Sequence, residues 1–274
     1  MISQEVLDQL ARRCQTPVLN IVREYFQHLF LAELYKSPES DKLLFKGGTA
    51  LRIVYGSPRF SEDLDFSLFD IEHRKIKEFV EHLFIEILSE IERIGVRVEL
   101  GKNPNVTTGG YFGDATLRLY DHEPMEIIIN VSKRDGRKMN GEVDSVVNDF
   151  VPAYNLIHLP QEGLVEEKVF GALLKRKKPR DFYDLYFMMR KGMLSIDQKK
   201  RLSALKTMII AEAAKIDFRQ ELAVFLPADQ QSIIRDFQRA FSSELNRQLS
   251  GAVKADKKNF KKTKKSKKAA AKTS

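Results

Sequence analysis

The chain has 274 residues, of which 43% are hydrophobic and 31% charged, a composition typical of a soluble globular protein with one large or two smaller domains. It contains no apolar run of the ~20 residues that a membrane helix needs and no signal-peptide pattern, so we expect a cytoplasmic protein that makes no use of a membrane. A single cysteine, Cys14, excludes an internal disulfide framework. The five histidines are scattered and give no zinc-ligand spacing.

The net charge of +8 is concentrated at the C-terminus. Residues 252–274 hold ten Lys and one Asp, so this tail carries +9 and residues 1–251 carry about −1. With almost no large apolar residues the tail cannot bury enough surface to fold alone, and we expect it to be disordered. Such a polycation attracts nucleic acid, or serves only as a solubilising appendage.

Apolar spacing predicts an α/β half followed by a helical half. Residues 1–40 read as a helical segment in two pieces that meet at Pro17, the second over 18–34. A buried strand at 43–45, a helix and a further strand lead to a long amphipathic helix over 71–94. Strands follow at 96–100, 111–120 and 125–131, with turns at 103–105 and 109–110. Beyond about residue 151 the pattern is almost wholly helical, with one apolar stripe over 229–249, so we expect domains at 41–150 and 151–251.

A glycine pair follows the first buried strand and predicts a phosphate-binding turn. Lys46 is followed by Gly47, Gly48 and Thr49. Glycines let the backbone approach a polyphosphate closely, and the free N–H groups at a helix start attract anions. Thr49 adds a hydroxyl and a helix cap. Arg59 and Ser61 follow as further candidate phosphate ligands, whereas Arg52 lies on the helix after the turn and is a candidate outward charge.

Two carboxylates lie downstream of this turn. Asp63 and Asp65 alternate with Leu64 and Phe66, so on a strand both acidic side chains would leave one face while the apolar pair packs on the other. Neighbouring carboxylates repel each other unless a cation lies between them. Mg²⁺ prefers oxygen ligands and substrate phosphates, and Mn²⁺ is the alternative occupant.

The run GGTALRIVYGSPRFSEDLDF resembles motif I of the AbiEii/AbiGii-type nucleotidyltransferase toxins, a branch of the DNA polymerase β superfamily. The resemblance implies a polymerase β-like nucleotidyltransferase core, in which a third carboxylate on a later strand completes the metal site with Asp63 and Asp65. Glu126, in a run rich in β-branched residues, is the favoured candidate. Asp121 is the competitor, but its neighbourhood reads as a turn.

A second group of polar residues occupies the helical half. Lys168, Ala172 and Arg176 recur every four residues, so one helix would present two cations on one face. Pro179 then begins the next helix, whose first turns hold Arg180, Asp181 and Asp184. The toxin family carries a similar pattern, which implies catalytic roles for Lys168 and Asp184 and nucleotide contacts for Arg176, Arg180 and Asp181. From the residues alone, a solvated helix face with Asp181 as an N-terminal cap is the alternative.

The resemblance implies a toxin of a toxin–antitoxin or phage-defence system, countered by a cognate antitoxin. It implies transfer of a nucleotide from a nucleoside triphosphate to an acceptor, with the 3′ end of tRNA as the expected site. Transfer to a small molecule or a protein hydroxyl remains an alternative, as does a non-catalytic nucleic-acid-binding protein. Retention of Asp63 and Asp65 argues against the last of these.

Truncation after Gly251 is expected to weaken RNA binding and flatten its salt dependence, because a flexible polycation acts through counterion release. The transfer rate at saturating acceptor should barely change, since such a segment cannot position a reacting atom. Acceptor affinity measured at two salt concentrations, with and without residues 252–274, tests this. Identical affinities and slopes would reduce the tail to a solubilising appendage.

Overall fold

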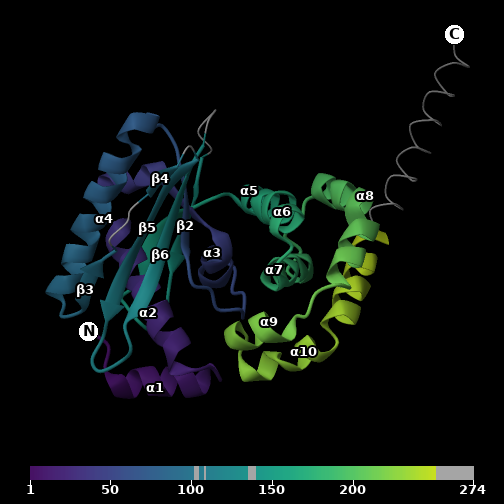
Figure 1. The fold of residues 1–274 in the computed structure, drawn as a ribbon, viewed down its shortest axis with the longest axis horizontal. Coiled ribbons are helices and arrows are strands. Elements are labelled where there is room, and N and C mark those ends of the chain that lie inside the picture. The colour runs from purple at the N-terminus through teal and green to yellow at the C-terminus, as the bar shows by residue number, and fades with distance from the viewer. Residues whose placement is uncertain (102–104, 108, 135–139, 251–274) are drawn as a thin grey trace, which may run out of the picture. The chain divides into compact units, whose positions relative to one another are not determined.

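The computed structural model describes residues 1–101, 105–107, 109–134 and 140–250 (Figure 1). These residues form two compact units. The first comprises Met1–Pro160 and Leu222–Gln231, and the second comprises Gln161–Glu221 and the chain from Ser232 onward. Most of the predicted turn at 103–105, and all of the lysine-rich tail, lie outside the described residues.

The first unit is built on a mixed sheet. Its strand order is β3-β5-β6-β2-β1-β8-β7, with β4 paired to β5. The central strand β2 runs antiparallel to β1 and parallel to β6. The strands are β1 Leu43–Lys46, β2 Leu64–Leu68, β3 Arg97–Leu100, β4 Asn105–Thr107, β5 Gly110–Arg118, β6 Met125–Lys133, β7 Glu142–Val146 and β8 Tyr154–His158. The predicted mixed α/β core is thus confirmed.

Two long helices, α2 (Val18–Leu34) and α4 (Ile76–Arg93), cover one face of this sheet (Figure 1). Both follow the predicted apolar spacing, and their buried side chains join those of β2, β5 and β6 in one core. On β6 burial alternates with period two, as expected for a strand with one covered face. The remaining helical elements of this part are α1 Gln4–Arg13, η1 Pro38–Lys42, α3 Gly47–Ile53 and η2 His73–Lys75.

The prediction that the chain beyond residue 151 is helical is wrong for β8. This strand pairs in parallel with β1 and antiparallel with β7, and so extends the sheet of the first unit. Strand β7 was not predicted either, because its sequence shows no apolar alternation. Four of its five residues are exposed in the structure. Long-range pairing of β8 with β1, and of β7 with β8, fixes these strands rather than a local pattern.

A distant segment, Leu222–Gln231, also belongs to the first unit. Phe225 joins its core, and its carbonyl accepts a hydrogen bond of 2.8 Å from the backbone N–H of Phe60. The side-chain amide of Asn20 donates to the carbonyl of Val224 over 3.0 Å. This segment therefore helps to hold the loop that precedes β2. It contains the short 3-10 helix η4, Ala228–Gln230.

The second unit is helical. Its helices are α5 Gln161–Val165, the π-helix η3 Glu166–Leu173, α6 Leu174–Arg176, α7 Pro179–Arg190, α8 Ile196–Ala213, the start of α9 (Arg219–Phe225), α10 Ser232–Arg235 and a helix over residues 237–250. Phe182, Phe218, Phe237 and Phe241 pack ring against ring in its interior. The predicted apolar stripe is buried from Ile234 to Leu249. No helix among the described residues is long and apolar enough to cross a membrane.

His28 on α2 gives the first unit a defined response to acid. Its Nδ1 lies 2.8 Å from the hydroxyl of Tyr154, and its ring stacks on Phe150. Burial, helped by the charge of Arg52, lowers the pKa of His28 to about 3. The imidazole is therefore neutral when folded but protonates near pH 6.5 when unfolded.

Below about pH 6.5 the unfolded chain binds more protons than the folded chain. The free energy of unfolding should therefore fall as the pH is lowered from about 6.5 to 3. Between pH 7 and pH 5 this residue should lower it by about 2 kcal/mol. The variant His28→Gln retains a polar partner for Tyr154 but does not titrate. Denaturant unfolding at pH 7 and pH 5 should show a smaller loss in the variant. Equal losses in both proteins would rule out a buried neutral His28.

Candidate active site

Three polar residues stand side by side on the face of the sheet opposite the core of Leu64 and Phe66. The strand register pairs Asp65 of β2 with Lys46 of β1 on one side and with Asn130 of β6 on the other. The amide Nδ2 of Asn130 donates a hydrogen bond of 3.2 Å to Oδ1 of Asp65. The predicted alternation of β2 is confirmed, because Leu64 and Phe66 are fully buried on the other face.

The glycine pair at the start of α3 lies against this row. Gly47 adopts φ +86°, and a Cβ atom there would overlap the carboxylate of Asp65. A Cβ at Gly48 would lie 2.6 Å from both Nη2 of Arg59 and Oγ of Ser61. One glycine therefore faces a carboxylate and the other faces a cation and a hydroxyl. A side chain at Gly47 or Gly48 would displace the groups that the sequence predicts to bind metal and phosphate.

Thr49 was expected to cap the start of α3, but the structure shows that it does not. Lys46 is the N-cap of α3, and Thr49 is the third helical residue. Its hydroxyl donates a hydrogen bond of 2.5 Å to the backbone carbonyl of Asp63, and its side chain is fully buried. Thr49 thus ties the helix to the residue that precedes β2. The hydroxyl positions Asp63 through its backbone.

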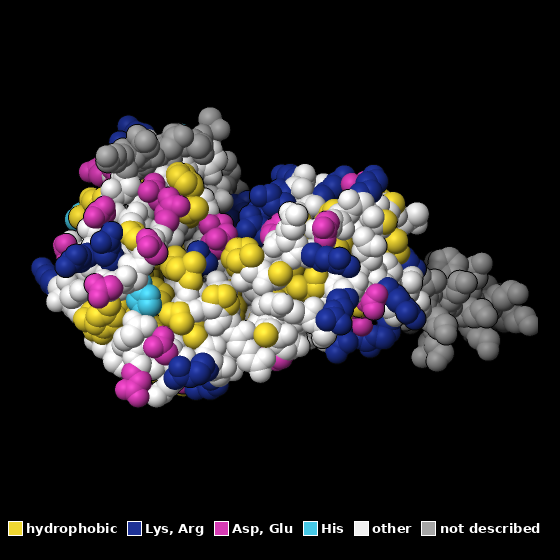
Figure 2. Space-filling model, turned by 60° about the horizontal axis from the view of Figure 1, so that its bottom comes forward, with side chains coloured by type: hydrophobic (Ala, Val, Ile, Leu, Met, Phe, Trp, Pro, Cys, Tyr) yellow, Lys and Arg dark blue, Asp and Glu magenta, His cyan; other side chains and the backbone are white. Residues whose placement is uncertain are grey.

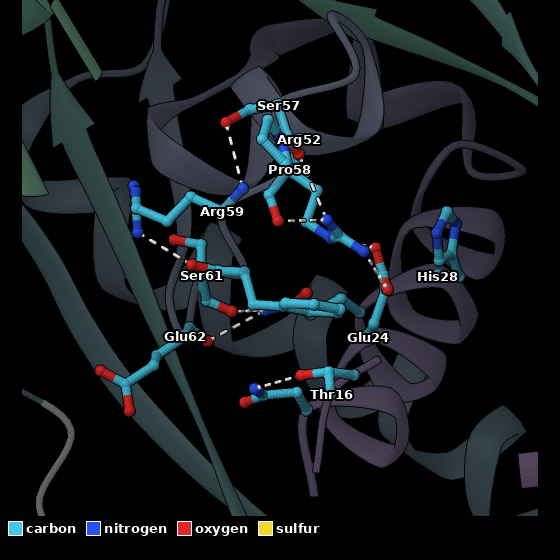
Figure 3. A network of polar contacts seen from close by, with 12 residues as sticks. Thr16, Glu24, His28, Arg52, Ser57, Pro58, Arg59, Ser61 and Glu62 are labelled. Carbon is cyan, nitrogen blue, oxygen red and sulfur yellow. Dashed lines mark hydrogen bonds and ion pairs between the residues drawn. The ribbon is translucent and has the colours of Figure 1, made fainter. Parts of the chain in front are cut away.

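A network of polar contacts holds the loop that carries Arg59 and Ser61 (Figure 3). Arg52 pairs with Glu24 of α2 through two contacts of 2.5 and 2.9 Å. Its Nη1 also donates to the carbonyls of Ser57 and Pro58. Arg52 is therefore half-buried in a bidentate ion pair, and its interpretation as an outward charge is wrong.

The same network also holds the loop at its C-terminal end, near Ser61 and Glu62. The amide of Gln27 donates to the carbonyl of Ser61 over 2.9 Å and to that of Glu62 over 3.1 Å. The guanidinium of Arg52 lies 3.5 Å from the centre of the Phe60 ring. Two residues of α2, Glu24 and Gln27, thus fix the loop from both sides. Sequence analysis missed both because this helix was interpreted from its apolar residues alone.

The predicted third carboxylate, Glu126, does not lie beside Asp65 in the sheet. The residue beside Asp65 on the later strand is Asn130, whereas Glu126 is exposed and four residues earlier, about 13 Å along β6. Asp121 is exposed in the turn between β5 and β6. Among the described residues no three acidic, His or Cys side chains form a metal-binding group. The sequence could not reveal this, because register depends on the pairing of β6 with β2.

Two ion pairs organise the predicted site residues of the second unit. Nζ of Lys168 lies 2.8 Å from Oδ2 of Asp184, a carboxylate that is 1% exposed. Nη2 of Arg176 lies 2.5 Å from Oδ1 of Asp181. The other oxygen of Asp181 accepts from the backbone N–H of Lys178, so this residue does cap α7.

The remaining predicted residue of this unit, Arg180, forms an ion pair of 3.4 Å with Glu221. Lys168 lies within a π-helix, a rare conformation that often marks functional positions. The predicted spacing of Lys168, Ala172 and Arg176 therefore falls on two kinds of helix rather than one. Each cation is nevertheless held by an aspartate from the first turns of α7.

The donor set of the first unit suits a hard cation that is held jointly with phosphate. Mg²⁺ is usually bound through one or two carboxylates and substrate phosphates rather than by an all-protein cage. Asp65 offers a carboxylate beside the glycine turn, and Asp63 offers a second just before the strand. Arg59 and Ser61 lie on the other side of the turn. The residues therefore fit a metal that arrives with a nucleotide.

Two solved structures with a similar fold are from Helicobacter pylori. JHP933 is 19% identical and superposes with a TM-score of 0.59 over 90% of this chain and 99% of its own. A candidate nucleotidyltransferase, also 19% identical, superposes with a TM-score of 0.56 over 93% of this chain and 99% of its own. No curated protein sequence matches the chain.

The sequence pattern of one protein family covers most of the chain. Residues 29–269 match the family described as nucleotidyl transferase AbiEii toxin of the type IV toxin–antitoxin systems. This span contains the glycine turn, β2 and both ion pairs of the second unit. The chain belongs to the AbiEii nucleotidyltransferase toxin family.

Proposed function

We propose that the protein transfers a nucleotide from a nucleoside triphosphate to an RNA acceptor, with the 3′ end of tRNA as the preferred site. The observation that carries the proposal is the glycine turn, where Gly47 adjoins the Asp65 carboxylate and Gly48 adjoins Arg59 and Ser61. Triphosphate bound at this turn has a cation on one side and acidic metal ligands on the other. Membership of the family supports a nucleotide substrate and an antitoxin partner.

In the proposed reaction the acceptor hydroxyl forms a bond to the α-phosphorus, and the bond to the β-phosphate oxygen breaks. Pyrophosphate leaves, and the hydroxyl proton passes to water. Arg59 and Ser61 bind the leaving phosphates, while the bare glycines allow the backbone to approach them. Mg²⁺ or Mn²⁺, held by Asp63 and Asp65, would stabilise the negative charge of the transferring phosphoryl group. Asn130 orients Asp65 through its amide.

Lys168 of the second unit is proposed to bind phosphate, with Asp184 as the residue that positions it. A buried aspartate fixes the ammonium in one place, and a fixed charge stabilises a developing negative charge better than a mobile one. Arg176, held by Asp181, is proposed to assist. The lysine-rich tail, which carries the positive net charge of the chain, suits an RNA acceptor.

Asp63→Asn and Asp65→Asn are each expected to lower the transfer rate at least a hundredfold, because each change removes a proposed metal ligand with little change of shape. Glu126→Gln, the matched control, should leave the rate within about twofold, since this residue is exposed and distant along β6. Transfer of labelled nucleotide to total RNA is the measurement. Full activity of both aspartate variants would refute the mechanism.

Lys168→Ala is expected to weaken binding of a non-hydrolysable triphosphate more than binding of RNA. It should also destabilise the fold, since Asp184 would lose the partner of a buried carboxylate. Arg201→Ala is the control, because it removes a cation from an exposed pair with Glu166. The measurement is the nucleotide affinity of the folded variants, obtained by titration. Unchanged affinity in the Lys168 variant would show that this lysine has a structural role only.

A further inference from the structure

A basic groove lies within the second unit, apart from Lys168 and Arg176. It has a volume of about 510 Å³ and is formed by residues 214–219 and 234–239. Four of the lining residues are cations, namely Lys215, Arg219, Arg235 and Arg239, against the two carboxylates Asp217 and Asp236. Lys and Arg side chains, drawn in dark blue, gather on the side of Figure 2 where this unit lies.

Three of these cations have exposed side chains without an ion-pair partner. Within the described part of the chain, the guanidinium groups of Arg219, Arg235 and Arg239 make no hydrogen bond or ion pair. Lys215 differs, because it pairs with Glu212 over 2.8 Å. Asp217 is also engaged, since it accepts a hydrogen bond from the backbone N–H of Arg219. With four cations against Asp217 and Asp236, the lining residues keep a net positive charge.

The groove is held in shape from below. Phe218 and Phe237 pack with their ring centres 4.6 Å apart beneath it and are almost fully buried. The side-chain amide of Gln238 donates to the carbonyls of Ala213, Ala214 and Ile216 over 3.3 to 3.4 Å. The two segments that carry the arginines are thus tied together. Arg235 ends α10, and Arg239 lies four residues later in the helix over residues 237–250.

We infer that this groove binds the phosphodiester backbone of the RNA acceptor, an inference that rests on the proposed function. Guanidinium groups bind phosphate oxygens in a bidentate manner, and they are less strongly hydrated than ammonium groups. A groove of about 510 Å³ lies in the size range of ligand-binding pockets and can accommodate nucleotide-sized groups. Because the aromatic rings below are buried, they are not available for base stacking, and recognition here is independent of base sequence.

The test uses the full-length protein and a fluorescently labelled tRNA transcript. In Arg235→Gln/Arg239→Gln, affinity should fall at least tenfold at low salt, and the slope of log affinity against log salt should decrease by about 1.5 to 2 units, as expected for the loss of two phosphate contacts. Lys191→Gln/Lys206→Gln is the matched control, because it removes two cations of the same unit that do not line the groove. In this control, neither the affinity nor the salt slope should change by more than about a third of the change expected for the groove variant.

Binding is measured in the Asp65→Asn background as well, so that loss of transfer and loss of RNA binding are scored separately. Equal affinities and slopes in the groove and control variants would overturn the inference, as would failure of the unmodified protein to bind the transcript. Loss of binding to the cognate antitoxin with RNA binding retained would also overturn it, and would assign the groove to an acidic protein surface. Absence of transfer by the unmodified protein would refute the proposed function while leaving the groove result intact, whereas full transfer in Asp65→Asn would refute only the proposed role of Asp65.

Discussion

The close approach of the glycine turn to the side chains around it is the constraint on which the candidate site depends. Gly47 leaves room for the carboxylate of Asp65, and Gly48 leaves room for Arg59 and Ser61. Any other residue at Gly47 would meet both the steric overlap and an unfavourable backbone conformation at φ +86°. The short β1–α3 connection therefore sets the separation between acidic and basic groups, and the rest of the first unit maintains it.

The surrounding structure keeps that arrangement rigid. Glu24 and Gln27 on α2 hold the loop before β2. Glu24 acts through Arg52, and Gln27 donates directly to the loop backbone. Thr49 fixes the backbone of Asp63. These contacts involve buried or half-buried polar groups, each of which would be costly to leave without a partner. A site that must place a metal and a polyphosphate benefits from such support, because small displacements of catalytic groups reduce rates strongly.

Local patterns predicted much of this molecule. The alternation around Asp65, the apolar spacing of α2 and α4, and Pro179 at the start of α7 all reflect nearest-neighbour geometry, and the structure agrees with them. Non-local pairing accounts for what was missed. The register of β6 places Asn130 rather than Glu126 beside Asp65, and residues 222–231 return to the first unit. Neither arrangement has a local signature, because both depend on contacts between distant segments.

The most direct test of the account is Mn²⁺ binding, followed by electron paramagnetic resonance, in the presence of a non-hydrolysable nucleoside triphosphate. Gly47→Ala should weaken metal–nucleotide binding at least tenfold, because the new methyl group displaces Asp65. Gly56→Ala is the control, since Gly56 has a similar φ of +75° but nothing within 4 Å of the added Cβ. The account predicts binding by Gly56→Ala close to that of the unmodified protein. Equal binding by the two glycine variants would contradict it.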